Sequence, residues 1–328
     1  MLTVLCPDAP LEDATDRRWP ERLLGRLQRS AVLARHRDDA PIPTLAPLES
    51  WLSTRFGLSL SGTVTVAAYQ RFAYPQPAPS AGEFTVTPVC LRAGMDHLVL
   101  QPGRDLQITA AEASQLIESA NAFLAQDGIS LAALDPDCWL LKIPDSLRLE
   151  LRSSMQAGGR NVHAYMPAGE DGRRLRSILN ELQMLWHDQP VNTRRQTEGL
   201  AAINSIWVEG QIRPDAISAP LQTSFATVFS DQAVTRGLAA GSGLSGTQEI
   251  RPVAAAQAEN LAACRGDVLL ELSGHGNLAV LDNLLQTWPH PVEICFTDER
   301  QWLDLKLSPL DRWRFWRRTT VANTPAKP

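Results

Sequence analysis

The residues best suited to chemistry gather between positions 174 and 210 of this chain. The sequence there is RLRSILNELQMLWHDQPVNTRRQTEGLAAINSIWVEG, in which a helical pattern meets a sharp break at Pro190 and a short apolar strand follows Gly199. Amides, a hydroxyl and two guanidiniums therefore cluster at the ends of regular elements, at Asn192, Arg194, Arg195, Asn204 and Ser205. Proteins of the α/β class usually place their ligand contacts at such ends.

This constellation has two interpretations. The planar fork of an arginine suits a phosphate or a carboxylate, and amides can hydrogen-bond a hydroxylated ligand, so the cluster can form an anion site. Alternatively, the amides and the hydroxyl are turn and capping residues, and the arginines are ordinary surface residues. Residue chemistry alone favours the second interpretation slightly.

Two histidines are candidates for the same site. His187 and Asp188 end the helical pattern, where a charged imidazole also complements the helix dipole without any ligand. His275 lies between glycines after a predicted strand, and ligands bind at such strand ends in open α/β sheets. A solvated turn explains His275 equally well. No cluster with metal-ligand spacing accompanies either histidine, so the sequence predicts no metal site.

Two further motifs are weak. Residues 241–246 (GSGLSG) match the glycine pattern of nucleotide-binding loops, but the GLAA before them is helical in character. Residues 312–318 (RWRFWRR) are basic and aromatic, but the segment is short and the whole chain is acidic. We interpret the first as a flexible loop and the second as a closing turn with packed aromatic rings.

Composition argues against several classes of protein. The chain has 328 residues, of which 44% are hydrophobic, and a net charge of −5. Nucleic-acid-binding proteins usually carry a basic excess, so we expect no nucleic-acid partner. We also expect no membrane partner and no secretory signal, because no run of about 18 apolar residues occurs and no basic region precedes an apolar one at the N-terminus. The five cysteines are scattered and form no CxxC pair, which favours a cytoplasmic protein with reduced, mostly buried thiols.

Strand-like and helix-like segments alternate along the chain. A capping box from Thr109 to Glu112 opens a helix whose apolar residues recur with helical period as far as Leu124. A second amphipathic helix occupies residues 175–186. Apolar runs predict strands at 1–6, 97–101, 138–143, 203–208, 267–272 and 291–297, and residues 16–36 and 224–240 are helix-like. The alternation predicts an α/β fold.

The loop at residues 75–82 (PQPAPSAG) suggests a division of the chain. We expect residues 1–82 to form an N-terminal section of the α/β core. Residues 83–318 would then contain the candidate ligand pocket, and residues 319–328 would be a polar tail.

Residues 189–210 (QPVNTRRQTEGLAAINSIWVEG) resemble a motif of the archaeal-type, cofactor-independent phosphoglycerate mutases. Residues 241–246 and 273–285 resemble that family more faintly. The resemblance implies the fold of the alkaline phosphatase superfamily, an α/β sheet with flanking helices, in which two divalent metals and a nucleophilic hydroxyl do the chemistry. Over most of its length the chain is more similar to bacterial RpfE-type regulatory proteins, at residues 91–100, 180–192, 203–210 and 312–318.

The chain departs from the mutase pattern where the metals would bind. Residues 1–60 contain no Asp-Gly opening segment, and His290 is the only histidine after residue 276. Other residues replace the pattern at Gln189, Glu209, Ser273 and Gly274, whereas the pattern is matched at Asn192, Arg195 and Asn204. The resemblance therefore implies a fold that is degenerate relative to the mutases, with part of a substrate pocket kept and the metal centre lost.

Three hypotheses follow. The first is a non-catalytic regulatory protein without cofactor that binds a small anionic metabolite, phosphorylated or carboxylated, through Asn192, Arg195 and Asn204, with His187 or His275 nearby. On this hypothesis Arg195→Ala abolishes anion binding and leaves folding nearly intact, as expected for a surface arginine. The second is a working phosphomutase or phosphatase that uses Mn²⁺ or Mg²⁺. The third is a module that binds a protein partner through an exposed apolar patch at Trp207, Trp313 or Trp316.

Overall fold

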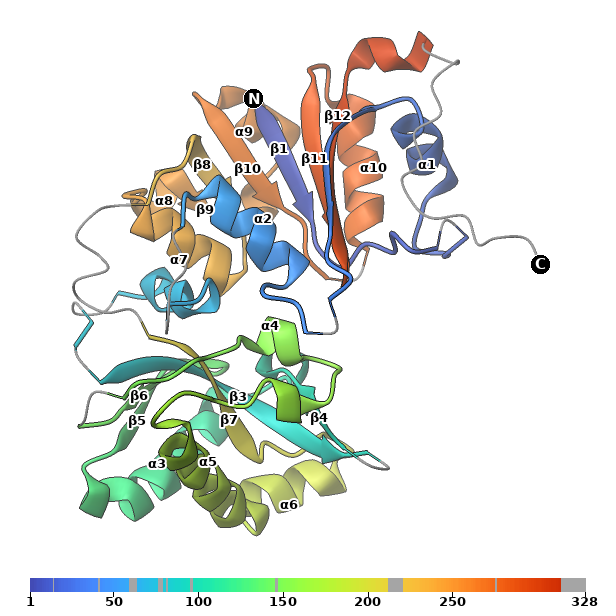
Figure 1. Cartoon of the computed structure of the whole chain (residues 1–328). Helices are drawn as coiled ribbons and strands as arrows, with labels where there is room; N and C mark the ends of the chain where they lie inside the picture. Colours follow the sequence, from blue (N-terminus) through green and yellow to red (C-terminus); the bar gives the residue numbers. More distant parts are fainter. Residues whose placement is uncertain are drawn as a thin grey trace. The chain divides into compact units, whose positions relative to one another are not determined.

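A computed structural model shows an α/β protein with two sheets and flanking helices, which confirms the predicted fold class (Figure 1). It describes residues 1–13, 15–40, 42–58, 64–75, 79–80, 82–94, 97–144, 147–211, 221–274 and 276–313. The chain divides into two compact units. Unit 1 comprises Met1–Gly57 and Leu221–Pro328, and unit 2 comprises Leu58–Pro220.

This division differs from the expected boundary after residue 82. The first strand, β1 (Leu2–Cys6), lies between β10 (Asp267–Glu271) and β11 (Val292–Thr297) and pairs with both in parallel. Its five residues are all buried. Residues 1–57 therefore belong to the same unit as the last third of the chain, a pairing that local composition does not reveal, whereas residues 58–82 belong to unit 2. The expected polar tail, residues 319–328, lies outside the described residues.

Unit 1 is built on a seven-stranded sheet in the order β2-β12-β11-β1-β10-β8-β9. Strands β8 (Phe225–Phe229) and β9 (Ile250–Arg251) continue the parallel part, whereas β12 (Gln301–Leu307) and β2 (Ala31–Arg37) are antiparallel. One face of the sheet packs against three helices, α1 (Glu21–Leu27), α9 (Ala258–Ala263) and α10 (Asn277–Thr287). Helix α2 (Pro47–Arg55) meets the other face, where the Trp51 indole donates to Asp304 at 2.8 Å.

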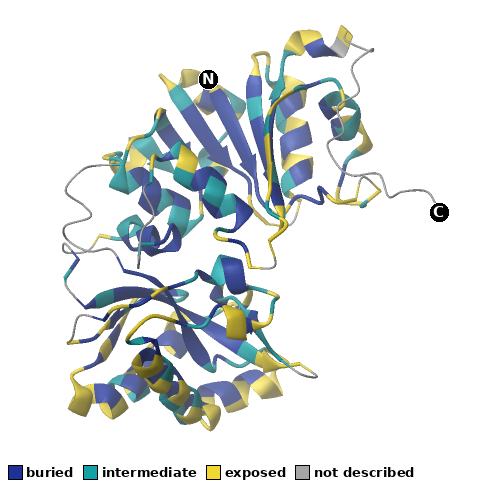
Figure 2. Cartoon of the chain, viewed as in Figure 1, coloured by how far each residue is buried: buried dark blue, intermediate teal, exposed yellow. Residues whose placement is uncertain are grey.

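Unit 2 contains a five-stranded antiparallel sheet in the order β4-β3-β6-β5, with β7 paired to β3. The strands are β3 (Glu83–Ala93), β4 (Leu98–Gln101), β5 (Ser130–Asp135), β6 (Cys138–Lys142) and β7 (Ser205–Gly210). Helices α3 (Ala110–Leu124) and α5 (Gly172–His187) bury their apolar faces in one core with this sheet, and Figure 2 shows the buried stripe along each. At the centre of that core Trp139 and Trp186 meet edge to face.

The remaining helices are short. Unit 1 adds α7 (Ala233–Gly241) and α8 (Gly246–Glu249), and unit 2 adds α4 (Ser154–Ala157) and α6 (Pro190–Thr197). Short 3₁₀ turns complete the fold at Ala67–Ala73, Gly103–Asp105, Ala125–Asp127, Val162–Ala164, Val253–Ala255 and Pro309–Trp313. Within the described part of the chain, every helix is too short or too polar to cross a bilayer.

Three local predictions were wrong. The helix-like run 224–240 is strand β8 followed by helix α7, and the run 16–36 is helix α1 followed by strand β2. The predicted break after the amphipathic helix is present at Asp188 and Gln189, but the residues from Pro190 onward form helix α6 instead of continuing the break, because proline at the first position of a helix needs no amide hydrogen. Helix α3, in contrast, begins at the predicted capping box, in which Thr109 accepts from the Glu112 amide.

The cap of α3 gives a test of local stability. We expect Thr109→Ala to lower the free energy of unfolding by about 1 kcal/mol, because an N-cap hydroxyl satisfies an amide at the helix start. Urea unfolding followed by circular dichroism measures the change. Thr193→Ala, at an exposed position inside α6, is the control and should cost less. Equal losses in both variants would contradict the role of the cap.

Candidate functional site

Arg195, the leading candidate for anion binding, is buried in unit 2 with 1% of its surface exposed. Its guanidinium donates through Nη1 to Glu112 Oε1 at 2.9 Å, through Nε to the Ala201 carbonyl at 2.7 Å, and through Nη2 to the Leu106 carbonyl. All three guanidinium nitrogens thus have protein acceptors. The expectation of a surface arginine was wrong, because helix α6 turns this side chain inward toward α3.

Glu112 is the partner that the sequence did not reveal. Its Oε2 accepts from the amide and the hydroxyl of Thr109 at 2.8 Å each, and its Oε1 accepts from Arg195. One carboxylate therefore closes the cap of α3 and neutralises a buried arginine 83 residues away. Burial alone would raise the pKa of Glu112, but the hydrogen bonds from Thr109 and Arg195 favour the charged form and lower the pKa below its usual value.

Asn192 joins the segment before β7 to helices α5 and α6. Its Nδ2 donates to the carbonyls of Trp186 and Ile203, at 2.8 and 2.9 Å, and its Oδ1 accepts from the Ile203 amide at 2.8 Å. The side chain is 5% exposed. The Asn192 side chain thus takes the place of a backbone partner for Ile203, which lies outside the helices and strands. An unpaired amide or carbonyl buried there would be costly.

Asn204 plays the same role beside strand β3. Its Oδ1 accepts from the Leu91 amide at 2.8 Å and its Nδ2 donates to the Leu91 carbonyl at 2.9 Å, so the amide extends the pairing of β7 with β3 by one position. Ser205, the first residue of β7, is 1% exposed and pairs with Val89.

The other predicted residues lie apart from this network. Arg194 faces solvent on α6, and the His187 side chain is 83% exposed at the end of α5, 3.9 Å from Asp188. His275 lies outside the described residues. In unit 2, Asn192, Arg195 and Ser205 are therefore buried and Asn204 is half-buried, and each already has an internal role. Their contact with a ligand stays a prediction.

Unit 1 presents a second place where polar side chains gather, at the carboxyl ends of its parallel strands. Open α/β sheets bind their ligands at this edge. Ser230 follows β8 and donates to Glu271, the last residue of β10, at 2.6 Å. Both side chains are almost fully buried. Burial, together with the nearby charge of Glu271, raises the pKa of the Cys6 thiol at the end of β1, so this thiol is not a ready nucleophile.

A pocket of about 320 Å³, here called the strand-end pocket, opens beside the ends of β1 and β11. Its charged residues are Asp8, Glu12, Asp13, Asp16, Arg18, Asp298, Glu299 and Arg300. Six carboxylates against two guanidiniums make the pocket acidic. It is better suited to a cation or a hydroxylated ligand than to a phosphate.

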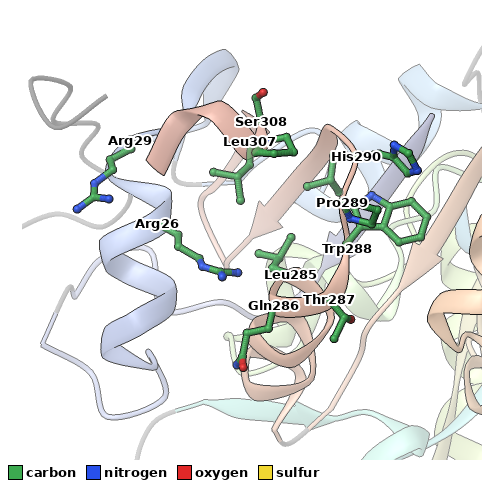
Figure 3. Close-up of a pocket in the computed structure, with 12 residues that line it drawn as sticks. Arg26, Arg29, Leu285, Gln286, Thr287, Trp288, Pro289, His290, Leu307 and Ser308 are labelled. Atoms are coloured by element: carbon green, nitrogen blue, oxygen red, sulfur yellow. The ribbon is translucent and has the colours of Figure 1, made fainter. Parts of the chain in front are cut away.

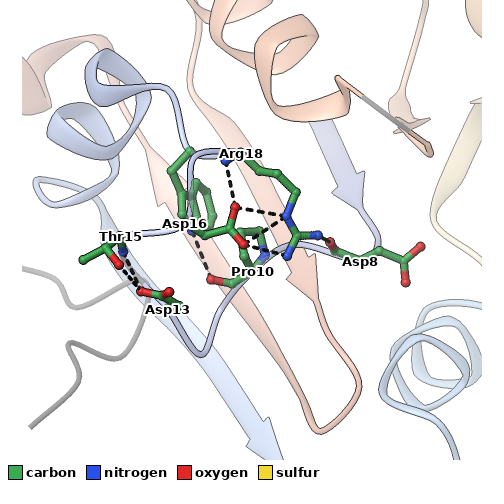
Figure 4. A network of polar contacts seen from close by, with 7 residues as sticks. Asp8, Pro10, Asp13, Thr15, Asp16 and Arg18 are labelled. Carbon is green, nitrogen blue, oxygen red and sulfur yellow. Dashed lines mark hydrogen bonds and ion pairs between the residues drawn. The ribbon is translucent and has the colours of Figure 1, made fainter. Parts of the chain in front are cut away.

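Local hydrogen bonds already engage several of these groups (Figure 4). Arg18 holds the Asp16 carboxylate through Nε and Nη2, at 3.1 and 3.0 Å, and donates to the Asp8 carbonyl at 3.1 Å. These hydrogen bonds from Arg18 lower the pKa of Asp16. Asp13 accepts from Thr15, and Asp298 accepts from the amides of Arg300 and Gln301.

Proteins hold metal ions through several donor side chains that lie close together. Over the described ranges, no three His, Cys, Asp or Glu side chains are grouped so that they could hold a metal ion. The carboxylates of the strand-end pocket thus do not fit a divalent metal centre as they stand, and we derive no catalytic step through one.

Comparison with known proteins gives a partial match. No family model matches the chain. Over 124 residues it is 31% identical to the 2,3-bisphosphoglycerate-independent phosphoglycerate mutase of Methanosarcina barkeri, which is 37% of this chain and 30% of the mutase. The chain is thus distantly similar to cofactor-independent phosphoglycerate mutases. The match spans less than a third of that enzyme.

A solved structure of low sequence identity bears on the fold alone. The PH0037 protein from Pyrococcus horikoshii aligns over 97% of this chain and 90% of its own, with a TM-score of 0.53 and 12% identity. The cofactor-independent phosphoglycerate mutase from Thermoplasma acidophilum aligns over 100% and 96% of the two chains, with a TM-score of 0.41 and 13% identity.

The buried ion pair leads to a prediction on stability. We expect Arg195→Ala to destabilise the protein by about 3–5 kcal/mol, because it leaves the Glu112 carboxylate buried without its partner. Arg194→Ala, one position away and exposed, is the matched control and should change stability by less than about 0.5 kcal/mol. Urea unfolding at pH 7 measures both. A small loss for Arg195→Ala would restore the original expectation of a dispensable arginine.

The same carboxylate predicts a pH dependence. Because the folded pKa of Glu112 is lowered, its contribution to stability is complete above the unfolded pKa of about 4.3 and is lost as the pH falls through the folded pKa. Wild type should therefore be more stable than Glu112→Gln at pH 7, and the difference should shrink as the pH falls below about 4.3.

Unfolding curves from pH 3 to 7 measure this difference in the free energy of unfolding. Glu118→Gln, at an exposed position of the same helix, is the control for general acid effects. A difference that stays constant with pH would contradict an ionised Glu112 as the stabilising form.

Proposed function

We propose that this chain is a non-catalytic, regulatory relative of the cofactor-independent phosphoglycerate mutases, of the RpfE type, that binds a small phosphorylated or carboxylated ligand. One observation carries the non-catalytic part of this proposal. Asn192, Arg195 and Asn204, which match the mutase motif, direct their polar groups to the protein's own backbone and to Glu112. This supports a retained mutase-like segment that has become part of the framework of unit 2.

The ligand class rests on the similarity to phosphoglycerate mutase, whose name states the metabolite on which that enzyme acts. A regulatory protein needs to bind such a metabolite and not to convert it. We place the protein in the cytoplasm, without nucleic-acid or membrane partners. The location is supported by free thiols that are mostly buried, at Cys6, Cys90, Cys138 and Cys295.

The principal alternative is a metal-dependent phosphomutase or phosphatase that uses Mn²⁺ or Mg²⁺. The observation in its favour is the 31% identity to a phosphoglycerate mutase over 124 residues of the chain. The described residues group no metal ligands together, so such an enzyme would need ligands from elsewhere.

A protein-interaction module remains a further alternative. Trp313 and Leu310 are 65% and 64% exposed on the 3₁₀ turn that follows β12, and this exposure suits a partner surface. Trp207, in contrast, is 2% exposed and does not belong to an exposed patch. Trp316 lies outside the described residues.

A ligand titration separates these functions. We expect 3-phosphoglycerate to raise the thermal midpoint of the purified protein saturably without added metal, because a ligand that binds only the native state stabilises it, by about 2.7 kcal/mol at one hundred times Kd. Glycerol at equal concentration is the control. A rise only with Mn²⁺ or Mg²⁺ present would favour the enzyme. No rise under either condition would overturn ligand binding and favour a protein partner.

A further inference from the structure

A second pocket of unit 1 lies at the opposite end of strand β11 from the strand-end pocket. It has a volume of about 480 Å³ and is here called the α1–α10 pocket (Figure 3). It opens between the last turn of α1, the end of α10 and the start of β11. The six residues of β11 separate the two pockets by roughly 16 Å, because a strand rises about 3.3 Å per residue. The two are therefore distinct sites.

The charge of the α1–α10 pocket is opposite to that of the strand-end pocket. Arg26, Arg29 and His290 line it, and none of the described residues that line it is acidic. The nearest carboxylate on the adjoining 3₁₀ turn, Asp311, accepts from the Ser308 amide and is buried. A pocket of this charge attracts anions.

Two residues that line this pocket, Arg26 and Trp288, each carry a donor group that has no acceptor among the described residues. The Arg26 guanidinium, half-buried on α1, has no hydrogen bond or ion pair in the described part of the chain, and Figure 3 shows it extending toward Leu285 and Gln286 of α10. The Trp288 indole Nε1 is buried and likewise without a partner there. A guanidinium and an indole can only donate, so a ligand that satisfies both must bring acceptor atoms.

An arginine in the last turn of a helix also complements the helix dipole, which gives Arg26 a role without a ligand. That role provides no acceptor for the indole. Trp288 follows α10 in an extended conformation, its amide bonded to the Leu284 carbonyl at 2.9 Å and its ring edge-on to His290. These contacts hold the ring in place. They leave the buried N–H of the indole as the feature that calls for an acceptor.

We infer that the α1–α10 pocket binds a small organic anion, whose phosphate or carboxylate oxygens accept from Arg26 and the Trp288 indole. The apolar side chains of Leu285, Val292 and Leu307 line the same pocket and would contact the carbon skeleton of the ligand. The volume lies within the range of small-molecule sites. This inference deepens the proposed function by naming a site, and it does not require that the ligand be 3-phosphoglycerate.

The test observes the indole N–H directly. The chain has nine tryptophans, and Trp288→Phe assigns the Trp288 signal in a ¹⁵N-resolved spectrum of the full chain. Three probes are titrated separately: 3-phosphoglycerate, inorganic phosphate and citrate. We expect at least one probe to shift the Trp288 signal saturably. Phosphate and citrate then show whether phosphate or carboxylate oxygens are recognised.

A pair of arginine variants shows whether the shift reports this pocket. Arg26→Gln should weaken binding by about tenfold or more, because it replaces a charge-assisted hydrogen bond by a neutral one. Arg22→Gln, on an exposed position of the same helix, is the matched control and should bind as wild type does. Spectra of the free variants confirm that both are folded.

Each outcome decides the inference. A Trp288 shift that depends on Arg26 and not on Arg22 supports it. No shift with any probe, or a shift unchanged by Arg26→Gln, overturns it. If 3-phosphoglycerate raises the thermal midpoint while Trp288 stays unchanged, the proposed function stands and the ligand binds elsewhere. If phosphate or citrate shifts Trp288 and 3-phosphoglycerate neither shifts it nor raises the thermal midpoint, the site stands and the proposed ligand class fails.

Discussion

The buried ion pair between Arg195 and Glu112 is the interaction on which the arrangement of unit 2 depends. An arginine that is 1% exposed must find acceptors inside the protein, because no water can replace them. Arg195 finds these acceptors in the carboxylate of Glu112, in the Leu106 carbonyl before α3 and in the Ala201 carbonyl after α6. The positions of these two helices are therefore linked, and the chain can then continue into β7 in the register that pairs it with β3.

Two asparagine side chains likewise satisfy polar groups of the backbone inside unit 2. Asn192 and Asn204 each pair with the amide and the carbonyl of one residue, Ile203 and Leu91, so each substitutes for a strand neighbour. Residue types that suit ligand binding also suit this internal role, because both demand donors and acceptors in fixed positions. Residues that match an enzyme motif can thus keep a structural role in this chain. They keep a role in ligand binding only where their polar atoms are directed at a ligand.

Unit 1 distributes its charges differently. Its parallel strands end in an acidic pocket, and the other end of β11 opens into a basic one. The two ends of one strand are thus suited to ligands of opposite charge. The central strands β1, β10 and β11 of the sheet are buried along almost their whole length, and the length of β11 separates the two pockets.

Local sequence determined much of the secondary structure. The capping box at Thr109, the apolar period of α3 and α5, and the short apolar runs that became β1, β4, β6, β7, β10 and β11 all depend on neighbouring residues, so they could be predicted. The pairing of strands that lie hundreds of residues apart could not be predicted in this way. Tertiary structure alone placed β1 between β10 and β11, turned Arg195 toward Glu112, and gathered Arg26 with Trp288, because burial and charge compensation depend on residues that meet only when the chain has folded.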